Sequence, residues 1–140
     1  MTKEAEVQKM TDIMSAFTAL VGKKLPDDVE AKLADLRSKE TAALSKTIYD
    51  AMAKNQQLAM DLNRPGCQDA GVLRYWVKCG ATCPLIGELE GLLKQAVIDA
   101  TVKAPLRHNS VETFDEYNTG KNVGKGTPTV FWEISPGRDD

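Results

Sequence analysis

Two short segments of the 140-residue chain combine side chains that could bind a ligand or move a proton. In the first, Cys67 is followed by Gln68 and Asp69 in a stretch that contains Pro65, Gly66 and Gly71. A thiolate presented by such a turn can ligate a metal ion instead of packing in the core. Asp69 could relay protons if burial or a neighbouring charge tunes its pKa. The alternatives are a loop cysteine without a role and a turn aspartate bonded to its own backbone.

The second segment places Arg107, His108 and Asn109 just after a predicted helix and Pro105. An arginine can hold a carboxylate through two parallel N–H bonds, which is the geometry needed to hold a dicarboxylic acid still. The simpler interpretation is that Arg107 and His108 favour the negative end of the helix dipole. Residue types alone do not separate these two interpretations.

The remaining cysteines indicate no metal site by themselves. Cys79 and Cys83 are four residues apart, and His108 is the only histidine. Together with Cys67 they could supply four zinc ligands, but their spacing matches no zinc pattern, so buried or incidental thiols are the stronger prediction. The glycines of residues 118–126 lack the spacing of a phosphate-binding loop. That stretch is better interpreted as a connection or a substrate-side loop.

Composition excludes several classes of partner. The net charge is −2 and the pI is about 5.5, which gives no electrostatic reason to expect nucleic acid or an anionic membrane as a partner. The charged N-terminal residues do not resemble a signal peptide, and no run approaches the ~20 apolar residues that span a bilayer. Three cysteines cannot all pair within one chain, which favours a reducing, cytoplasmic setting.

Hydrophobic spacing predicts that residues 1–62 form helices. One apolar stripe extends from Val7 to Val21, and Gly22 is placed to end that helix in a left-handed conformation. Pro26 and the acids after it suit the first turn of a second helix. A third stripe continues from Leu44 to Leu62, although the polar residues 55–57 interrupt it.

The second half of the chain predicts less regular structure. Residues 63–71 form a loop, residues 72–78 and 129–134 are strand candidates, residues 110–128 form a loop, and a clear helix extends from Leu89 to before Pro105. The predicted fold class is therefore α+β and mostly helical. Because two short strands make a poor sheet on their own, residues 1–140 are expected to be an incomplete part of a larger domain.

Three stretches together resemble one known family. These are residues 62–69 (Leu-Asn-Arg-Pro-Gly-Cys-Gln-Asp), residues 93–109 and residues 111–122 with their Asn-Thr-Gly-Lys-Asn ending. They are similar to the iron–sulfur family of class I fumarate hydratases and L-tartrate dehydratase α subunits. The resemblance covers nearly the whole chain and corresponds to the N-terminal portion of that α domain.

The resemblance implies a hydro-lyase that removes water from a hydroxy-dicarboxylic acid such as tartrate or malate. It implies a 4Fe–4S cluster held by three cysteines, with one open iron that acts as a Lewis acid. Cys67 would be one cluster ligand, Gln68 and Asp69 would contact the substrate, and Asp69 would take part in proton transfer. Arg107 would bind a substrate carboxylate, and His108 and Asn109 would lie near the site.

Two departures from the family pattern limit what this stretch is expected to do alone. Ala70 stands where the family usually has threonine, which removes a hydrogen bond from the loop. Cys79 and Cys83 do not fall at family ligand positions, so the chain alone should be inactive and need a β subunit or C-terminal domain, in a homo-oligomer or heterotetramer. The alternative is a non-catalytic truncated paralogue that acts as a subunit-interaction module.

Overall fold

The computed structural model describes residues 2–67, 71–112 and 114–140 of the chain. The described elements are four helices and four strands, α1 (Lys3–Val21), α2 (Asp27–Lys39), α3 (Ala43–Asp61), β1 (Arg74–Gly80), α4 (Leu89–Lys103), β2 (Val111–Glu112), β3 (Tyr117–Asn118) and β4 (Thr129–Ser135). This is an α+β arrangement dominated by helix, as predicted. No helix among these residues is both long and apolar enough to cross a bilayer.

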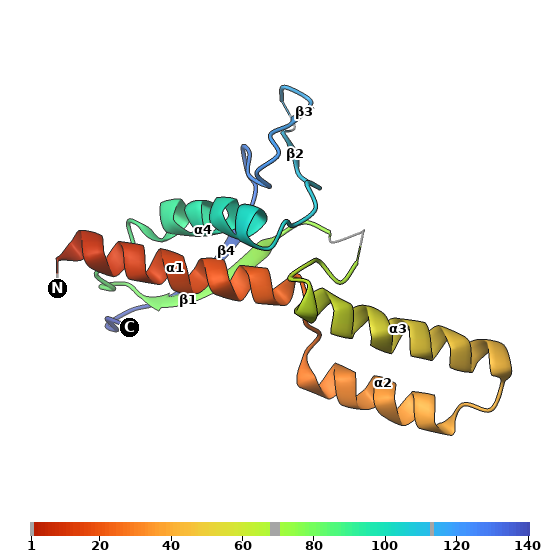
Figure 1. Cartoon of the computed structure of the whole chain (residues 1–140). Helices are drawn as coiled ribbons and strands as arrows, with labels where there is room; N and C mark the ends of the chain where they lie inside the picture. Colours follow the sequence, from red (N-terminus) through yellow and green to blue (C-terminus); the bar gives the residue numbers. More distant parts are fainter. Residues whose placement is uncertain (1, 68–70, 113) are drawn as a thin grey trace.

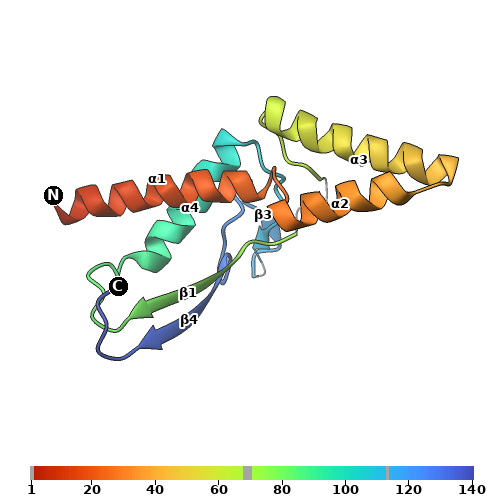
Figure 2. The same cartoon turned by 90° about the horizontal axis from the view of Figure 1, so that it is seen from below.

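The body of the molecule consists of α1, α4 and a two-stranded sheet. β1 and β4 pair in parallel, with Arg74 opposite Thr129 and Gly80 opposite Ser135, and α4 lies between them in the sequence. Figures 1 and 2 show α1 and α4 packed together beside this sheet. A hydrogen bond of 2.7 Å between the hydroxyls of Thr18 and Tyr75 joins α1 to β1.

The contact between α1 and α4 uses small side chains. The residues that α1 buries are Thr11, Ser15, Thr18 and Ala19, which follow one another at helical spacing. α4 buries Leu92, Leu93, Ala96, Val97, Ala100 and Thr101. Small side chains allow two helices to approach closely, so the close packing of the body is built here.

The apolar stripe of α1 does not supply this core. Ile13, Phe17, Leu20 and Val21 are each at least 40% exposed. Their spacing predicted the helix correctly, but the helix turns a different face toward α4. These four residues are therefore uncovered within the described part of the chain, whereas Val7, Met10 and Met14 of the same stripe are half-buried.

Gly22 ends α1 in a way that the sequence did not predict. Its φ of −70° is right-handed, so the expected left-handed cap is wrong. A Cβ on Gly22 would lie 2.7 Å from Cδ2 of Leu106, which is closer than real Cβ atoms come to a carbon. A side chain here would force Leu106 to shift, and Leu106 is buried in the same small core cluster as Ala19.

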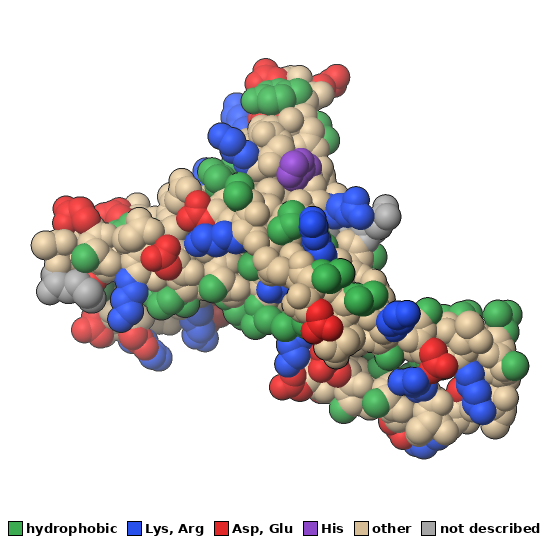
Figure 3. Space-filling model, in the orientation of Figure 1, with side chains coloured by type: hydrophobic (Ala, Val, Ile, Leu, Met, Phe, Trp, Pro, Cys, Tyr) green, Lys and Arg blue, Asp and Glu red, His purple; other side chains and the backbone are tan. Residues whose placement is uncertain are grey.

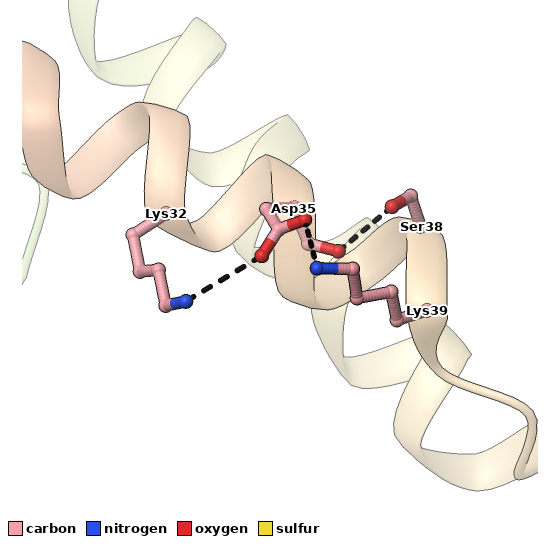
Figure 4. Close-up of polar contacts among 4 residues, drawn as sticks. All are labelled: Lys32, Asp35, Ser38 and Lys39. Atoms are coloured by element: carbon pink, nitrogen blue, oxygen red, sulfur yellow. Dashed lines mark hydrogen bonds and ion pairs between the residues drawn. The ribbon is translucent and has the colours of Figure 1, made fainter.

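Helices α2 and α3 form a hairpin that extends away from the body as an arm (Figure 1). α2 begins directly after Pro26, as predicted, and has no buried residue. Exposed polar contacts line it: Asp35 pairs with Lys32 and Lys39, and Ser38 donates to the Asp35 carbonyl (Figure 4). α3 continues without interruption through residues 55–57, because these polar residues lie on a largely exposed helix surface.

The remaining predictions for strands and loops hold with shifted boundaries. β1 begins at Arg74 rather than residue 72 and extends to Gly80, and β4 extends one residue further than expected. The predicted loop 110–128 contains a short antiparallel pair in which Val111 faces Asn118 and Glu112 faces Tyr117. This pair projects from the body near the end of α4 (Figure 1).

Candidate functional site

The loop that leads to Cys67 is held between the ends of three helices. Asn63 adopts a left-handed backbone conformation (φ 51°) directly after α3. Its side-chain oxygen accepts from Nζ of Lys23 at 2.8 Å, and its Nδ2 donates to the carbonyl of Lys103 at 2.7 Å. Since Lys23 follows α1 and Lys103 ends α4, Asn63 joins the C-terminal ends of α1, α3 and α4.

Cys67 lies on the exposed side of this loop. The amide of Gly66 donates to the carbonyl of Gly22 at 3.0 Å, and Nδ2 of Asn55 donates to the Gly66 carbonyl at 2.6 Å. Cys67 is exposed and borders a depression of about 300 Å³ whose lining includes Lys23 and Lys24. The fixed backbone on its N-terminal side presents the thiol to solvent.

Gln68, Asp69 and Ala70 lie outside the described residues, so their predicted roles are not tested by the geometry. The described chain resumes at Gly71. The carbonyl of Gly71 accepts from Nδ2 of Asn109 at 3.3 Å. Asn109 is therefore next to the end of the loop, consistent with its expected place near the site.

Arg107 and His108 border a second, larger depression of about 840 Å³. Arg64 and Pro65 from the loop border the same depression, and its full lining is Arg64, Pro65, Thr101, Val102, Pro105, Leu106, Arg107, His108 and Gly120. Arg107 and His108 are exposed, and the one histidine of the chain is visible on the surface in purple in Figure 3. Two segments that are about forty residues apart in sequence thus meet at one surface hollow.

The larger depression suits an anionic ligand. It contains two arginines, Arg64 and Arg107, and neither forms a salt bridge with the residues that the structure describes. Guanidinium groups bind carboxylates through paired N–H bonds. The charges of these two arginines favour an anion over a neutral ligand.

Two asparagines that sequence reasoning overlooked hold the Arg107 segment in place. Nδ2 of Asn122 donates to the carbonyl of Arg107 at 2.8 Å, and its Oδ1 accepts from the amides of Asn109 and Ser110 at 3.0 and 3.4 Å. Nδ2 of Asn118 donates to the carbonyl of His108. The available signal was the Asn-Thr-Gly-Lys-Asn sequence, because asparagine readily bonds backbone groups in turns.

The other two cysteines are not at this site. Cys79 is buried on β1, and Cys83 follows in the turn after that strand. Among residues 2–67, 71–112 and 114–140, no group of three or more His, Cys, Asp or Glu side chains is arranged to hold a metal ion. The four-residue zinc alternative is therefore not formed, and the described residues offer one exposed thiol beside the depressions.

Comparison with known proteins decides the family. The family model described as fumarate hydratase (fumerase) matches residues 11–140. The chain belongs to the fumarate hydratase family. The resemblance inferred from the loop around Cys67 and from residues 93–122 is thereby confirmed.

Individual relatives narrow the comparison within the fumarate hydratase family. The chain is 54% identical over 138 residues to the L(+)-tartrate dehydratase subunit alpha of Escherichia coli and, equally, to that of Shigella boydii. It is 29% identical over 133 residues to a putative L(+)-tartrate dehydratase subunit alpha of Methanocaldococcus jannaschii. These matches cover 99% and 94% of this chain but 46% and 47% of the relatives. The chain thus spans about half the length of the curated relatives it matches.

Proposed function

We propose that this chain forms part of a 4Fe–4S-dependent hydro-lyase that reversibly eliminates water from a hydroxy-dicarboxylic acid. The observation that supports this best is the meeting of the Arg64–Pro65 loop with Arg107 and His108 around one depression. In the elimination, a C–OH bond breaks while a proton leaves the adjacent carbon. Tartrate is the substrate favoured by the relatives' names, giving oxaloacetate after tautomerisation, and malate with fumarate is the other pair within the class.

The proposed residues differ in their roles. Arg107 binds a substrate carboxylate through its guanidinium group, since it borders the depression with no salt bridge to the described residues. Gln68 contacts the substrate, and Asp69 both contacts it and takes part in proton transfer. His108 and Asn109 complete the surroundings of Arg107. Binding of both ends of the acid would orient it for elimination.

Cys67 is proposed as one ligand of the cluster. Its exposed thiol on a backbone fixed at Gly66 fits that role, and the described residues supply no further thiol beside it. The remaining ligands therefore have to come from polypeptide outside the described residues, which agrees with a chain spanning half of its relatives. When bound, such a cluster supplies an open iron that polarises the substrate hydroxyl as a Lewis acid.

The partner is proposed to be a β subunit or C-terminal domain. The relatives are named as α subunits, and the sheet formed by β1 and β4 leaves Trp76, Phe131 and Ile134 exposed. We place the protein in the cytoplasm, because the three cysteines of this chain are free thiols. We propose an oligomer because the relatives are named as subunits. The exposed sheet also fits the second candidate function, a non-catalytic subunit-interaction module.

Cysteine variants of the complete enzyme test the proposal. Cys67→Ser should abolish hydro-lyase activity and lower iron content and visible absorbance, because serine is a harder and more basic ligand than thiolate. Cys79→Ser and Cys83→Ser are matched controls, and both should keep the cluster at a modest cost in stability. If either control loses the cluster as completely as Cys67→Ser, the ligand assignment is wrong.

The 140-residue chain alone distinguishes the enzyme from the interaction module. Anaerobic reconstitution with iron and sulfide should give no stoichiometric cluster and no dehydratase activity. Activity should appear only when the remaining polypeptide is supplied. An assembly with every subunit present, loaded with iron and still inactive toward tartrate and malate, would favour the module.

A further inference from the structure

Asn122 is a buried residue with an unusually complete set of hydrogen bonds. Its side chain donates to the Arg107 carbonyl at 2.8 Å and to Oγ1 of Thr101 at 3.1 Å, and it accepts from the amides of Asn109 and Ser110 at 3.0 and 3.4 Å. Only 5% of its surface is exposed. The side chain of Asn122 therefore bonds residues 107–110 both through its NH2 group and through its oxygen.

The position of Asn122 is itself fixed by helix α4. Thr101 Oγ1 donates to the carbonyl of Val97 at 2.8 Å within that helix, and Val97 is fully buried. Asn122 has a left-handed backbone (φ 57°), a conformation that asparagine adopts more readily than most residues. A rigid helix is thus connected through Thr101 and Asn122 to the backbone of Arg107.

We propose that Asn122 is a positioning residue that fixes Arg107 for binding a substrate carboxylate. This inference rests on the proposed function, because it assumes that Arg107 contacts the substrate. Asn122 does not border the larger depression, so it acts through the backbone of residues 107–110. A small displacement of a group that binds the substrate can weaken binding by a large factor. The connection from Thr101 through Asn122 would therefore matter by keeping Arg107 in place.

Two variants in the complete enzyme separate the bonds that Asn122 makes. Asn122→Gly removes all four bonds while keeping the left-handed backbone accessible. Asn122→Asp keeps an acceptor for the amides of Asn109 and Ser110 but cannot donate to the Arg107 carbonyl. Gln95→Ala is the control, since Gln95 lies exposed on α4 and bonds only Asp99 among the described residues.

Hydrogen exchange measures whether the bonds hold the segment. In peptides covering residues 106–111, Asn122→Gly should speed exchange of the Ser110 amide by at least about fivefold. The Asn109 amide should respond less, because it also donates to the Arg107 carbonyl at 3.0 Å. Asn122→Asp should leave those two amides mainly protected. Unchanged exchange in a folded Asn122→Gly enzyme overturns the inference. Thermal melting of each variant verifies that it is folded.

Steady-state kinetics measure whether the segment serves the site. Both variants should raise KM for the hydroxy-dicarboxylate about tenfold with kcat changed far less, because binding in the ground state and transition state is lost equally. Gln95→Ala should match the unmodified enzyme. Arg107→Lys should raise KM at least as much as the Asn122 variants.

The Arg107→Lys result separates the two possible failures. If Arg107→Lys raises KM and the Asn122 variants do not, the positioning role is wrong while the proposed function stands. If Arg107→Lys leaves KM unchanged, the proposed role of Arg107 fails, and the inference built on it fails as well.

Discussion

At the scale of single residues, Glu112 shows how a charged side chain organises a loop through backbone amides. It is buried on β2, and its carboxylate accepts from the amides of Phe114 at 2.6 Å, Asp115 at 2.8 Å and Lys125 at 3.3 Å. These amide bonds, that from Asp115 first, hold the pKa of Glu112 below its ordinary value of 4.5. Three donors to one carboxylate favour its charged form.

The lowered pKa of Glu112 predicts a pH dependence of stability. A carboxyl whose pKa is lower in the folded state stabilises the fold above its unfolded pKa, and that contribution is lost as pH falls through the folded pKa. In urea unfolding, the unmodified chain should therefore be more stable than Glu112→Gln at neutral pH. The difference should begin to shrink below about pH 4.5 and vanish at more acid pH.

Glu116→Gln is a suitable control for this pH series, because Glu116 is exposed in the same loop. Its urea midpoint should differ little from that of the unmodified chain at any pH. If the difference in urea midpoint between the unmodified chain and Glu112→Gln stays the same at every pH, the prediction is wrong.

Residue types suggested candidate site residues, whose roles stay predictions. Cys67 and Arg107 were chosen because thiolate and guanidinium groups have distinctive chemistry, and both are exposed, Cys67 beside the smaller depression and Arg107 beside the larger one. Asn122 and Asn63 were missed, since their bonds join residues 12 to 40 positions apart. The sequence around an asparagine does not show which distant backbone groups its side chain will bond.

At the scale of elements, periodicity predicted where helices form but not which face they bury. The large apolar residues of α1 are exposed, whereas Ser15 is fully buried against α4. The spacing of apolar residues predicts such a helix, but the tertiary packing of the whole chain determines which face is buried. Helix α2 buries no residue, and its exposed ion pairs contribute little to stability.

Packing of α1 on α4 makes a testable prediction. Oγ of Ser15 is buried without a hydrogen-bond partner among the described residues, and an unsatisfied buried hydroxyl is costly. Ser15→Ala should therefore leave stability unchanged or raise it by up to ~1 kcal/mol. Ala96→Leu, at a fully buried position on α4, should lower stability by about 1–3 kcal/mol through overpacking.

Urea unfolding followed by circular dichroism checks both changes. Ala16→Leu is the matched control for Ala96→Leu, because Ala16 lies exposed on α1. A strong loss of stability in Ser15→Ala would show that the hydroxyl has a partner that this packing does not include. An Ala96→Leu variant as stable as Ala16→Leu would mean that α1 and α4 are not closely packed.

At the scale of the whole molecule, the sheet has unpaired strand edges and an uncovered aromatic pair in the described part of the chain. Within the described residues β1 and β4 pair only with each other, so each has a free edge. Trp76 and Phe131 stack on the outer face with ring centroids 5.2 Å apart, yet they are 73% and 45% exposed. Free strand edges and exposed aromatic patches are typical of surfaces that another polypeptide covers.

The sheet therefore predicts that the 140-residue chain, studied alone, associates with itself. Sedimentation should show species above the monomer that grow with protein concentration. Trp76→Glu should shift the distribution toward monomer, because a carboxylate on the outer face resists burial against a second apolar surface. Lys78 and Glu133, paired at 2.5 Å on that same face, should add a modest sensitivity to salt.

Leu44→Glu distinguishes this surface from the arm. Leu44 is 75% exposed on α3, so it matches Trp76 as an exposed apolar residue on a different element. If the sheet is the contact, Leu44→Glu should leave the concentration dependence of the unmodified chain in place. If Leu44→Glu dissociates the larger species to monomer and Trp76→Glu does not, the arm is the associating surface and the prediction for the sheet is wrong. A clean monomer at high concentration for the unmodified chain would contradict association through either surface.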